Sequence, residues 1–308
     1  MIASPLYAQS YPNKPIRFIL PSPPGGAVDT IGRIVGQKLT EGLGQPVVME
    51  NRPGAGNTIG TEITVKAPPD GYTLVLASAS TTISPSLYRK LRYDVTKDLA
   101  PVSKVAVGNQ VFLVHPSLPV NNVKELLAYA KANPGKLNFG SGGIGNPAHL
   151  ALELLKSLTQ INLVHVPYKG AGPAMIGLLG GEVNMMASSM AAAIPHIQAG
   201  KAKALALLAD ERSTLLSNVP TAKEAGIDNW VVPSCYGFLA PAGTPRDIID
   251  RLNAVWIKSA AMPDTIEKLK NLGVEPLTST PEQYGEFLKA EIARWGKVTR
   301  EANIKSFD

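Results

Sequence analysis

The stretch Ile16-Arg17-Phe18-Ile19-Leu20, followed by Pro21-Ser22-Pro23-Pro24-Gly25-Gly26, decides the fold. The first five residues form an apolar strand that ends at a loop rich in proline and glycine. In residues 30–39 the apolar positions recur at helical spacing, and Asp29 precedes them as a suitable N-cap. A second strand is expected at 47–50. This succession of strand, glycine loop, helix and strand predicts parallel pairing through a right-handed crossover, which is typical of α/β proteins.

The same alternation continues along the chain and forms two blocks. Further strands are expected at 73–77, 100–107, 110–115, 163–167, 183–187 and 202–208, with helices at 56–66, 123–131, 147–158 and from 172. The long apolar stretches 105–115 and 231–240 are where the chain is expected to cross between two lobes. Helices at 245–261 and 281–302 then return to the first lobe.

Composition excludes several classes of protein. The chain has 308 residues, enough for two domains, and its 44% hydrophobic and 18% charged residues are typical of a globular protein. The net charge is +6, but Lys and Arg are scattered, so we expect no nucleic-acid partner. Cys235 is the single cysteine and lies in an apolar run, which indicates a small packed side chain. Four scattered histidines have no metal-ligand spacing, and we predict neither a metal nor a cofactor.

Residues 1–10 differ in character from the rest. Ser4-Pro5-Leu6-Tyr7-Ala8-Gln9 resembles the end of a signal peptide. We therefore interpret residues 1–10 as a signal-peptide remnant, leave them out of the fold, and expect an exported protein.

Two glycine-rich loops are candidate anion-binding sites. In the first, Pro23 to Asp29, glycines let backbone amides point outward at the beginning of a helix, where the helix dipole favours negative charge. The candidate ligand residues of this loop are Gly26, Ala27, Val28 and Asp29. The second loop, 140–149, has the same pattern, with Pro147 suited to the first helical turn. Its candidates are Ser141, Gly143, Gly145, Asn146 and His149, although for His149 packing is the alternative to facing the ligand.

Other loops that follow strands can complete the walls of such a site, because ligands of open α/β sheets bind at the carboxyl ends of strands. These additional candidates are Ser78, Ala79, Ser80, Tyr168, Gly170, Ala171, Ala187 and Ser188.

Enzyme motifs match poorly. The run Gly54 to Gly60 has one residue too many for a dinucleotide fingerprint, and the chain has neither a phosphate-loop Gly-Lys-Ser/Thr nor a Gly-x-Ser-x-Gly elbow. We therefore predict no catalytic residue. A competing hypothesis is a periplasmic enzyme, for which His149 is the candidate general base.

The motifs of the chain, taken together, resemble the Bug family, the TctC-like substrate-binding proteins of tripartite tricarboxylate transporters. They are Tyr11-Pro12-x-Lys14-Pro15-Ile16, Pro23-Pro24-Gly25-Gly26-x-x-Asp29, Glu50-Asn51-Arg52-Pro53-Gly54-Ala55-Gly56, Pro69-Asp70-Gly71-Tyr72-Thr73, Val166-Pro167-Tyr168-Lys169-Gly170, Pro195-His196-Ile197-x-Ala199-Gly200-Lys201 and Ala240-Pro241-Ala242-Gly243-Thr244-Pro245. The similarity covers about residues 11–300.

The resemblance implies a periplasmic binding protein with a Venus-flytrap fold, in which two mixed sheets flanked by helices are joined by crossing strands. We expect lobe I to comprise 11–107 and 236–308, and lobe II to comprise 108–235. The resemblance also implies that a ligand carboxylate is held by backbone amides, hydroxyl groups and ordered waters of the 23–29 and 140–149 loops. The expected partners are a small carboxylate and the membrane permease subunits of the transporter, and the expected state is a monomer.

The chain departs from this family at one place. Many relatives have Gly-Glu-Val-Asp-x-Met-Phe-Asp where this chain has residues 181–188, so that Ala187 replaces Phe and Ser188 replaces the second Asp. The lost carboxylate disfavours a ligand with an ammonium group, and the smaller Ala187 predicts room for a bulkier ligand. We therefore expect a di- or monocarboxylate without an amine, including aromatic ones such as terephthalate. A sensor that docks on a receptor remains an alternative to transport.

Overall fold

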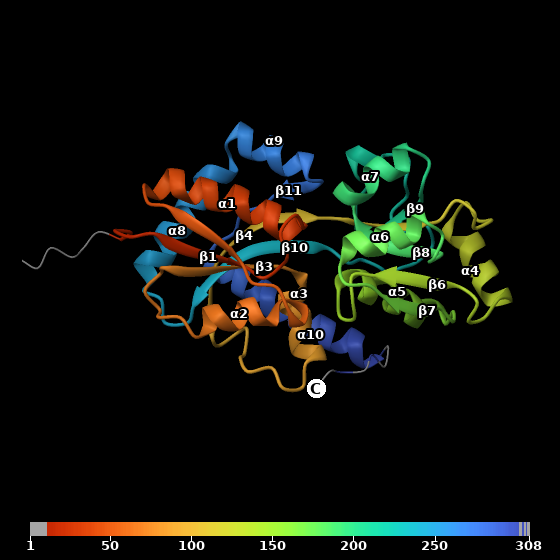
Figure 1. Cartoon of the computed structure of the whole chain (residues 1–308), viewed down its shortest axis with the longest axis horizontal. Helices are drawn as coiled ribbons and strands as arrows, with labels where there is room; N and C mark the ends of the chain where they lie inside the picture. Colours follow the sequence, from red (N-terminus) through yellow and green to blue (C-terminus); the bar gives the residue numbers. More distant parts are fainter. Residues whose placement is uncertain (1–10, 302–303, 305, 307–308) are drawn as a thin grey trace, which may run out of the picture.

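The computed structural model describes residues 11–301, 304 and 306, so the predicted signal-peptide remnant lies outside the described residues. Two lobes lie side by side along the long axis, each built on one β-sheet that helices flank (Figure 1). Among the described helices, none has the length and apolar character needed to span a bilayer.

Lobe I contains a six-stranded mixed sheet. In spatial order its strands are β11 (Val274–Pro276), β4 (Leu99–Gly108), β10 (Ser234–Pro241), β3 (Thr73–Ala77), β1 (Ile16–Leu20) and β2 (Val47–Asn51). Strand β1 pairs in parallel with β2 and β3, whereas β10 runs antiparallel to β3 and β4. The predicted strand–loop–helix–strand unit is thus confirmed as β1, α1 and β2.

Helices cover both faces of this sheet. They are α1 (Ala27–Leu43), the 3-10 helix η1 (Ala55–Asn57), α2 (Thr58–Val65), α3 (Ala79–Leu87), α8 (Arg246–Ala260), α9 (Pro263–Asn271) and α10 (Pro281–Glu301). Helices α1, α8 and α9 lie on one face, and α2, α3 and α10 on the other (Figure 1). Alternate residues of β1 serve the two faces, because Phe18 packs with Trp256 of α8 while Ile19 packs with Tyr284 of α10.

Lobe II contains a five-stranded mixed sheet. In spatial order its strands are β7 (Val164–Pro167), β6 (Asn138–Ser141), β8 (Met185–Ser189), β5 (Gln110–Val114) and β9 (Lys203–Leu207). Its helices are α4 (Val123–Ala132), α5 (Pro147–Thr159), α6 (Ala171–Leu179), α7 (Met190–Gln198) and the 3-10 helix η2 (Thr214–Leu216). Strand β6 is parallel to β7 and β8, and β5 is antiparallel to its neighbours.

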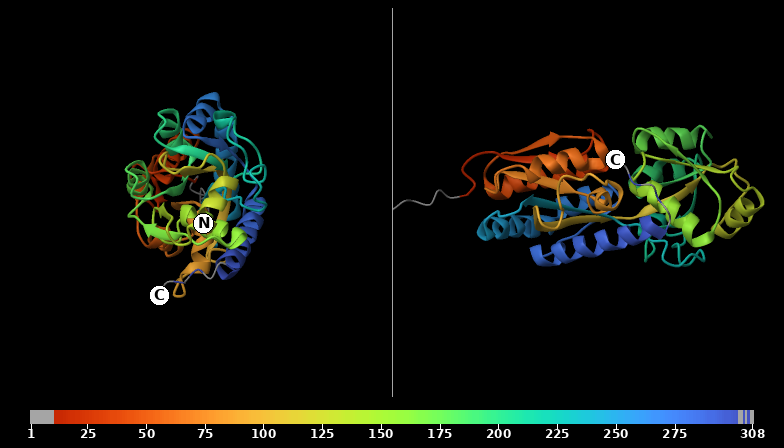
Figure 2. Two further views of the ribbon diagram at one scale, coloured as in Figure 1. Left: turned by 90° about the vertical axis from the view of Figure 1, so that its right-hand side faces the viewer. Right: turned by 90° about the horizontal axis from the view of Figure 1, so that it is seen from below.

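The chain passes between the lobes in extended segments. Strand β4 of lobe I ends at Gly108, and β5 of lobe II begins at Gln110. Strand β10 begins the return at Ser234. Helix α10 runs along lobe I to the edge of lobe II, where Trp295 joins an apolar cluster with Phe112 and Trp230 (Figure 2). The division of the lobes at 107/108 and 235/236 stays a prediction.

Three α-helices were not predicted from the sequence. The segment 78–82, which the sequence predicts as a loop, enters α3, and the sequence predicts neither α7 nor α9. Both α3 and α7 contain an internal proline, Pro85 and Pro195, which lacks the amide proton that a helix interior uses. In α3 the loss is offset by tertiary packing, because Ile83 and Leu87 are buried in the core.

Candidate functional site

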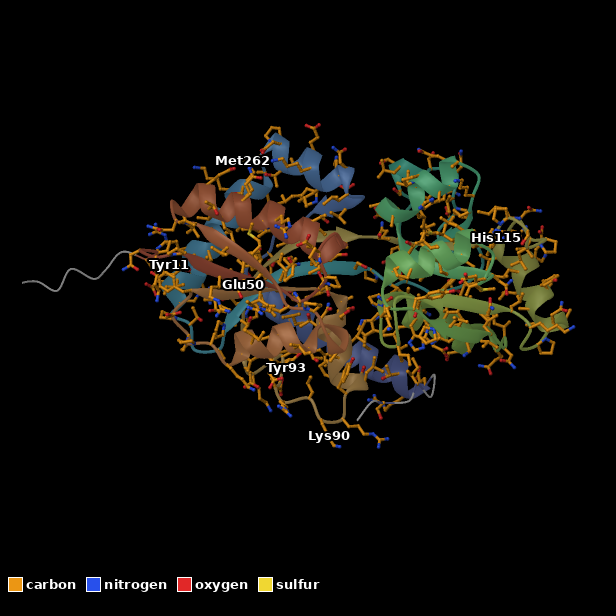
Figure 3. The ribbon with its side chains drawn as sticks, viewed as in Figure 1. Tyr11, Glu50, Lys90, Tyr93, His115 and Met262 are labelled. Carbon is orange, nitrogen blue, oxygen red and sulfur yellow. The ribbon has the colours of Figure 1, made fainter. Side chains whose placement is uncertain are left out.

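The carboxyl ends of the parallel strands in both lobes face the junction between the lobes. Strand β1 starts on the side of Tyr11, at the outer end of lobe I, and β8 starts beside His115, in the outer part of lobe II (Figure 3). Both strands run inward. The helices that follow these strands, α1, α3, α5, α6 and α7, therefore begin near the junction, where their amide ends favour an anion.

The beginning of α1 leaves backbone amides uncommitted. Its N-cap is Gly26, in extended conformation, and not Asp29 as predicted. A glycine has no side chain to accept hydrogen bonds from the first turn, so the amides of Ala27, Val28 and Asp29 have no partner within the helix. Gly26 and Ala27 are exposed. This end of α1 can donate several hydrogen bonds to a carboxylate.

The Asp29 side chain is buried and stabilises the loop from behind. Its carboxylate accepts hydrogen bonds from Gly25 N (2.9 Å) and Asn51 Nδ2 (2.9 Å) and forms an ion pair with Arg33 (2.9 Å). Burial raises the pKa of this carboxyl, but the bonds from Arg33, Gly25 and Asn51 outweigh it, so the pKa lies below its usual value. The side chain of Asp29 is thus occupied, and what it offers a ligand is its backbone amide.

The predicted residues Ser78, Ala79 and Ser80 lie at the beginning of α3. Ser78 is the N-cap, its hydroxyl accepts from Asn57 Nδ2 (3.3 Å), and its amide donates to Thr81 Oγ1 (3.2 Å). The first-turn amides of Ala79 and Ser80 lack an acceptor within the helix. Strand β3 lies beside β1, so this helix end adds to that of α1.

A small pocket lies beside this helix end. The residues that line it are Ser78, Ala79, Thr82, Pro233, Cys235, Tyr284, Phe287, Leu288 and Glu291. Burial raises the pKa of the Cys235 thiol to about 12, which keeps it protonated and unreactive. This agrees with the packing role expected for Cys235.

The second glycine-rich loop, between β6 and α5, uses most of its own hydrogen-bonding groups. Ser141 is fully buried, and its hydroxyl contacts Gly143 O (3.0 Å) and Gly143 N (3.2 Å). Asn146 is the N-cap of α5 and accepts from Ala148 N (2.8 Å), while Gly145 N donates to His149 Nδ1 (3.2 Å). Ile144, at the exposed side of the loop, is 45% exposed.

His149 is a packed residue, and a neighbour that the sequence did not single out accompanies it. The ring centroids of His149 and His165 are 4.1 Å apart, and Phe139 stacks on His165 at 4.8 Å. Burial, with contributions from His165 and Lys156, lowers the pKa of His149 to about 3. A base this weak is a poor general base at neutral pH, which argues against the enzyme hypothesis. His165 faces inward from the strand β7. A lone histidine in an apolar strand does not mark itself in the sequence as part of a site, so His165 was not among the predicted residues.

The loop after β7 packs directly on the second glycine-rich loop. Gly170 is the N-cap of α6 with φ 125°, and Ala171 begins the helix. A Cβ at Gly142 would lie 2.9 Å from Ala171 N, so the two loops are in close contact. The side chain of Tyr168 turns away, because its hydroxyl donates to Glu182 Oε2 (3.0 Å), beyond the far end of α6. Tyr168 therefore packs the fold, while the amide of Ala171 lies with the other helix ends.

The two positions at which the chain departs from its family pattern lie at the end of β8. Ala187 is fully buried in the cluster that contains Phe112 and Trp230, so its methyl group faces the core of lobe II. Ser188 is buried as well, and α7 begins directly after β8. A larger side chain at position 187 would extend into this core and not toward a ligand. The smaller Ala187 therefore does not provide the room for a bulkier ligand that the sequence predicts.

Comparisons with known proteins agree with this geometry. The sequence model described as tripartite tricarboxylate transporter family receptor (TctC) matches residues 31–304. BugT of Bordetella pertussis is 40% identical over 306 residues, which cover 99% of this chain and 94% of that protein. A protein from the tcbD-tcbE intergenic region of Pseudomonas sp. (strain P51) is 38% identical over 298 residues, which cover 96% of this chain and 89% of that protein.

Similar solved structures have the same two-lobed fold. Rpa4515 of R. palustris with adipate has a TM-score of 0.89 and 32% identity, covering 96% of this chain and 100% of that one. The periplasmic binding protein BugD has a TM-score of 0.87 and 33% identity, with coverage of 96% and 100%. MatC from Rhodopseudomonas palustris with bound malate has a TM-score of 0.84 and 31% identity, with coverage of 94% and 99%. The predicted fold, two mixed sheets flanked by helices in a periplasmic binding protein, is thereby confirmed.

Proposed function

Because the chain belongs to the tripartite tricarboxylate transporter family of receptors, we propose that it captures a small carboxylate between its lobes and delivers it, chemically unchanged, to membrane permease subunits. It does so in the periplasm, as a monomer. The carboxylate is a mono- or dicarboxylate without an amine, and aromatic bodies such as that of terephthalate belong to this class.

The observation that carries this proposal is the open amide end of α1. Its first-turn amides follow the exposed Gly26 and point into a region toward which α3, α5 and α6 also direct their amino-terminal ends. Backbone amides in such a place bind anions without a cationic side chain, and waters can bridge where the fit is loose. Two related proteins of this fold were solved with adipate and with malate, which are both dicarboxylates.

The charges at the site support a ligand without an ammonium group. Among the ligand residues proposed from the sequence, Asp29 is the one that carries a carboxylate, and Arg33, Gly25 and Asn51 already occupy it. An ammonium group would thus be desolvated without a free counter-charge from these residues. Ile144 offers an exposed apolar surface to a hydrocarbon or aromatic body.

A proline substitution tests the amide site with little risk to the fold. Ala27 is exposed and is the first residue of α1, where proline is well tolerated, and Gly26 has the extended backbone (ψ 169°) that precedes proline. Ala27→Pro removes one amide donor. If that amide binds a carboxylate, affinity should fall about 10- to 100-fold, the effect of one hydrogen bond to a charged group. Ala27→Val, which keeps the amide and adds similar bulk, is the control.

The measurement is a thermal-shift screen of wild type with adipate, malate, benzoate, terephthalate, aspartate and glutamate. A ligand at 100 times its Kd stabilises the folded state by about 2.7 kcal/mol, which is readily seen as a higher Tm. We expect the amine-free acids to raise the Tm. Ala27→Pro should reduce this stabilisation to about 0.4–1.4 kcal/mol at the same ligand concentration, and Ala27→Val should keep it. Mass spectrometry after long incubation should recover the ligand intact. A response to aspartate and glutamate alone would contradict the proposed ligand class, and a converted ligand would contradict simple capture.

A further inference from the structure

Two imidazole rings lie buried directly behind the lobe II loop, and capture of a carboxylate by backbone amides does not by itself require them. His149 comes from the first turn of α5 and His165 from β7. Their rings stack on each other and on Phe139 of β6. His149 is 5% exposed, so its ring cannot itself reach a ligand at the loop surface.

Each ring contacts a different part of the loop. Nδ1 of His149 accepts the amide proton of Gly145 (3.2 Å), near the end of the loop. Nε2 of His165 lies 2.7 Å from Ser141 Oγ, at its beginning. The Ser141 hydroxyl in turn contacts both the amide and the carbonyl of Gly143. The two rings therefore hold both ends of a loop whose glycines would otherwise allow many conformations.

The hydrogen bonds assign the proton of the His149 ring and are compatible with a neutral His165 ring. Because His149 Nδ1 accepts from Gly145, its proton is on Nε2, which lies 3.8 Å from Glu153 Oε1. With its proton donated to Gly143 O, the Ser141 hydroxyl accepts from Gly143 N and from His165 Nε2–H. In the alternative arrangement the hydroxyl donates to an unprotonated Nε2, and the His165 ring is neutral there as well. All the contacts are satisfied with two neutral rings. A charged His149 would present a second donor to the amide of Gly145 and break that contact.

The surroundings keep the rings neutral. Burial and then the neighbouring His165 and Lys156 lower the pKa of His149, and burial and then Lys156 lower that of His165 to about 4. The charged groups that face the pair come from α5, namely Glu153 and Lys156, which bind each other at 2.8 Å. From β6 the pair meets Phe139 and the Ser141 hydroxyl.

We propose that His149 and His165 are positioning residues of the ligand site, which fix the loop 140–146 so that its remaining free amides and those of α6 face the carboxylate. This inference rests on the proposed function for its consequence in binding. Its structural part, that the two rings hold the loop, can be tested without any ligand.

Matched substitutions separate the acceptor from the ring. His149→Asn places Oδ1 where Nδ1 lies and so keeps an acceptor for Gly145, but it loses the stack on His165. His149→Phe keeps the stack and loses the acceptor. For the second ring, His165→Gln keeps a donor at the Nε2 position, and His165→Phe removes it. If packing alone mattered, the Phe variants would resemble wild type, so the two explanations predict opposite orders.

The first measurement is hydrogen–deuterium exchange at neutral pH, read by mass spectrometry on peptides that cover 140–149, without ligand. We expect exchange in this segment to rise about tenfold in the two Phe variants, the effect of one lost hydrogen bond, and to stay within about threefold of wild type in the Asn and Gln variants. Urea unfolding should rank His149→Phe at least as stable as His149→Asn, because it keeps the stack. Equal exchange in all five proteins would overturn the proposal, whether or not a ligand is known.

The second measurement is the affinity for adipate, or for whichever acid raises the Tm of wild type most, by isothermal titration calorimetry. We expect His149→Phe to bind the acid about tenfold more weakly than wild type and His149→Asn to retain affinity within about threefold. The order of affinity of the two variants is thus the reverse of their expected order of stability. A wild type that responds to no carboxylate would refute the proposed function, while the exchange experiment would still decide the role of the rings. A wild-type affinity in His149→Phe would refute the positioning role.

Discussion

Acidification should destabilise the ligand-free protein through its buried histidine pair. The pKa of His149 is about 3 in the folded protein, below the 6.5 usual for histidine, so the unfolded chain takes up the proton first as pH falls. The stability that the neutral ring contributes is therefore complete above about pH 6.5 and is lost between that pH and about 3. At pH 4.5 nearly all of the unfolded chain, but little of the folded protein, carries this proton. The resulting loss for His149 alone is about 3 kcal/mol.

The assay is urea unfolding at pH 7.5 and at pH 4.5, followed by the fluorescence of the tryptophans, which are fully buried at Trp230, Trp256 and Trp295. His149→Asn removes the titrating ring but leaves the carboxylates of the protein unchanged, so their contribution cancels between the two proteins. We expect the free energy of unfolding to fall between these pH values by about 2–3 kcal/mol less in the variant than in wild type. The same fall in both proteins would show that His149 titrates normally, and would refute the argument from burial.

Two further substitutions test the packing around the site. Gly142→Ala places a Cβ 2.9 Å from Ala171 N, so it should force the two lobe II loops apart, lower the free energy of unfolding by about 1–3 kcal/mol and weaken carboxylate binding. The control is Gly172→Ala, whose Cβ would have no atom within 4 Å, and it should be neutral or stabilise the protein by up to about 1 kcal/mol. Thermal shifts with and without ligand check both, and equal effects would contradict the contact. Trp230→Phe removes the bond from Nε1 to Ala151 O (2.7 Å) in the core and should cost about 2 kcal/mol in urea unfolding, so an unchanged midpoint would show that this bond contributes nothing.

The fold was predictable because apolar periodicity and glycine loops act locally. Apart from the exposed Arg17, the residues of the run 16–20 are buried, and such a strand is a mainly apolar segment that propensity identifies. Helices α3 and α7 were not predictable in this way, because Pro85 and Pro195 argue against a helix in a local reading. Tertiary contacts that involve residues far apart in the sequence override that preference, and a local pattern carries no information about them.

The direction in which a strand side chain points is a second property that the sequence alone did not predict. Ala187 was chosen because it departs from a family pattern at a strand end, and the alternation of β8 places it toward Phe112, in the core. A difference in sequence at a site thus need not be a difference at the ligand surface. Which face a strand residue takes depends on the strand's neighbours, and for a strand buried on both faces the sequence shows no polar alternation that would tell them apart.

The two glycine-rich loops differ most in the number of backbone amides that remain free for a ligand, and their sequences do not show this difference. Both have glycines before a helix, and both predict exposed amides. In the first, the N-cap is a glycine and the nearby Asp29 reaches back to Gly25, so the amides of the first helical turn stay free. In the second, Asn146 and His149 occupy amides of their own loop. Glycine content therefore predicts that a loop can present amides, but the polar side chains on the following helical turn determine how many of them remain for a ligand.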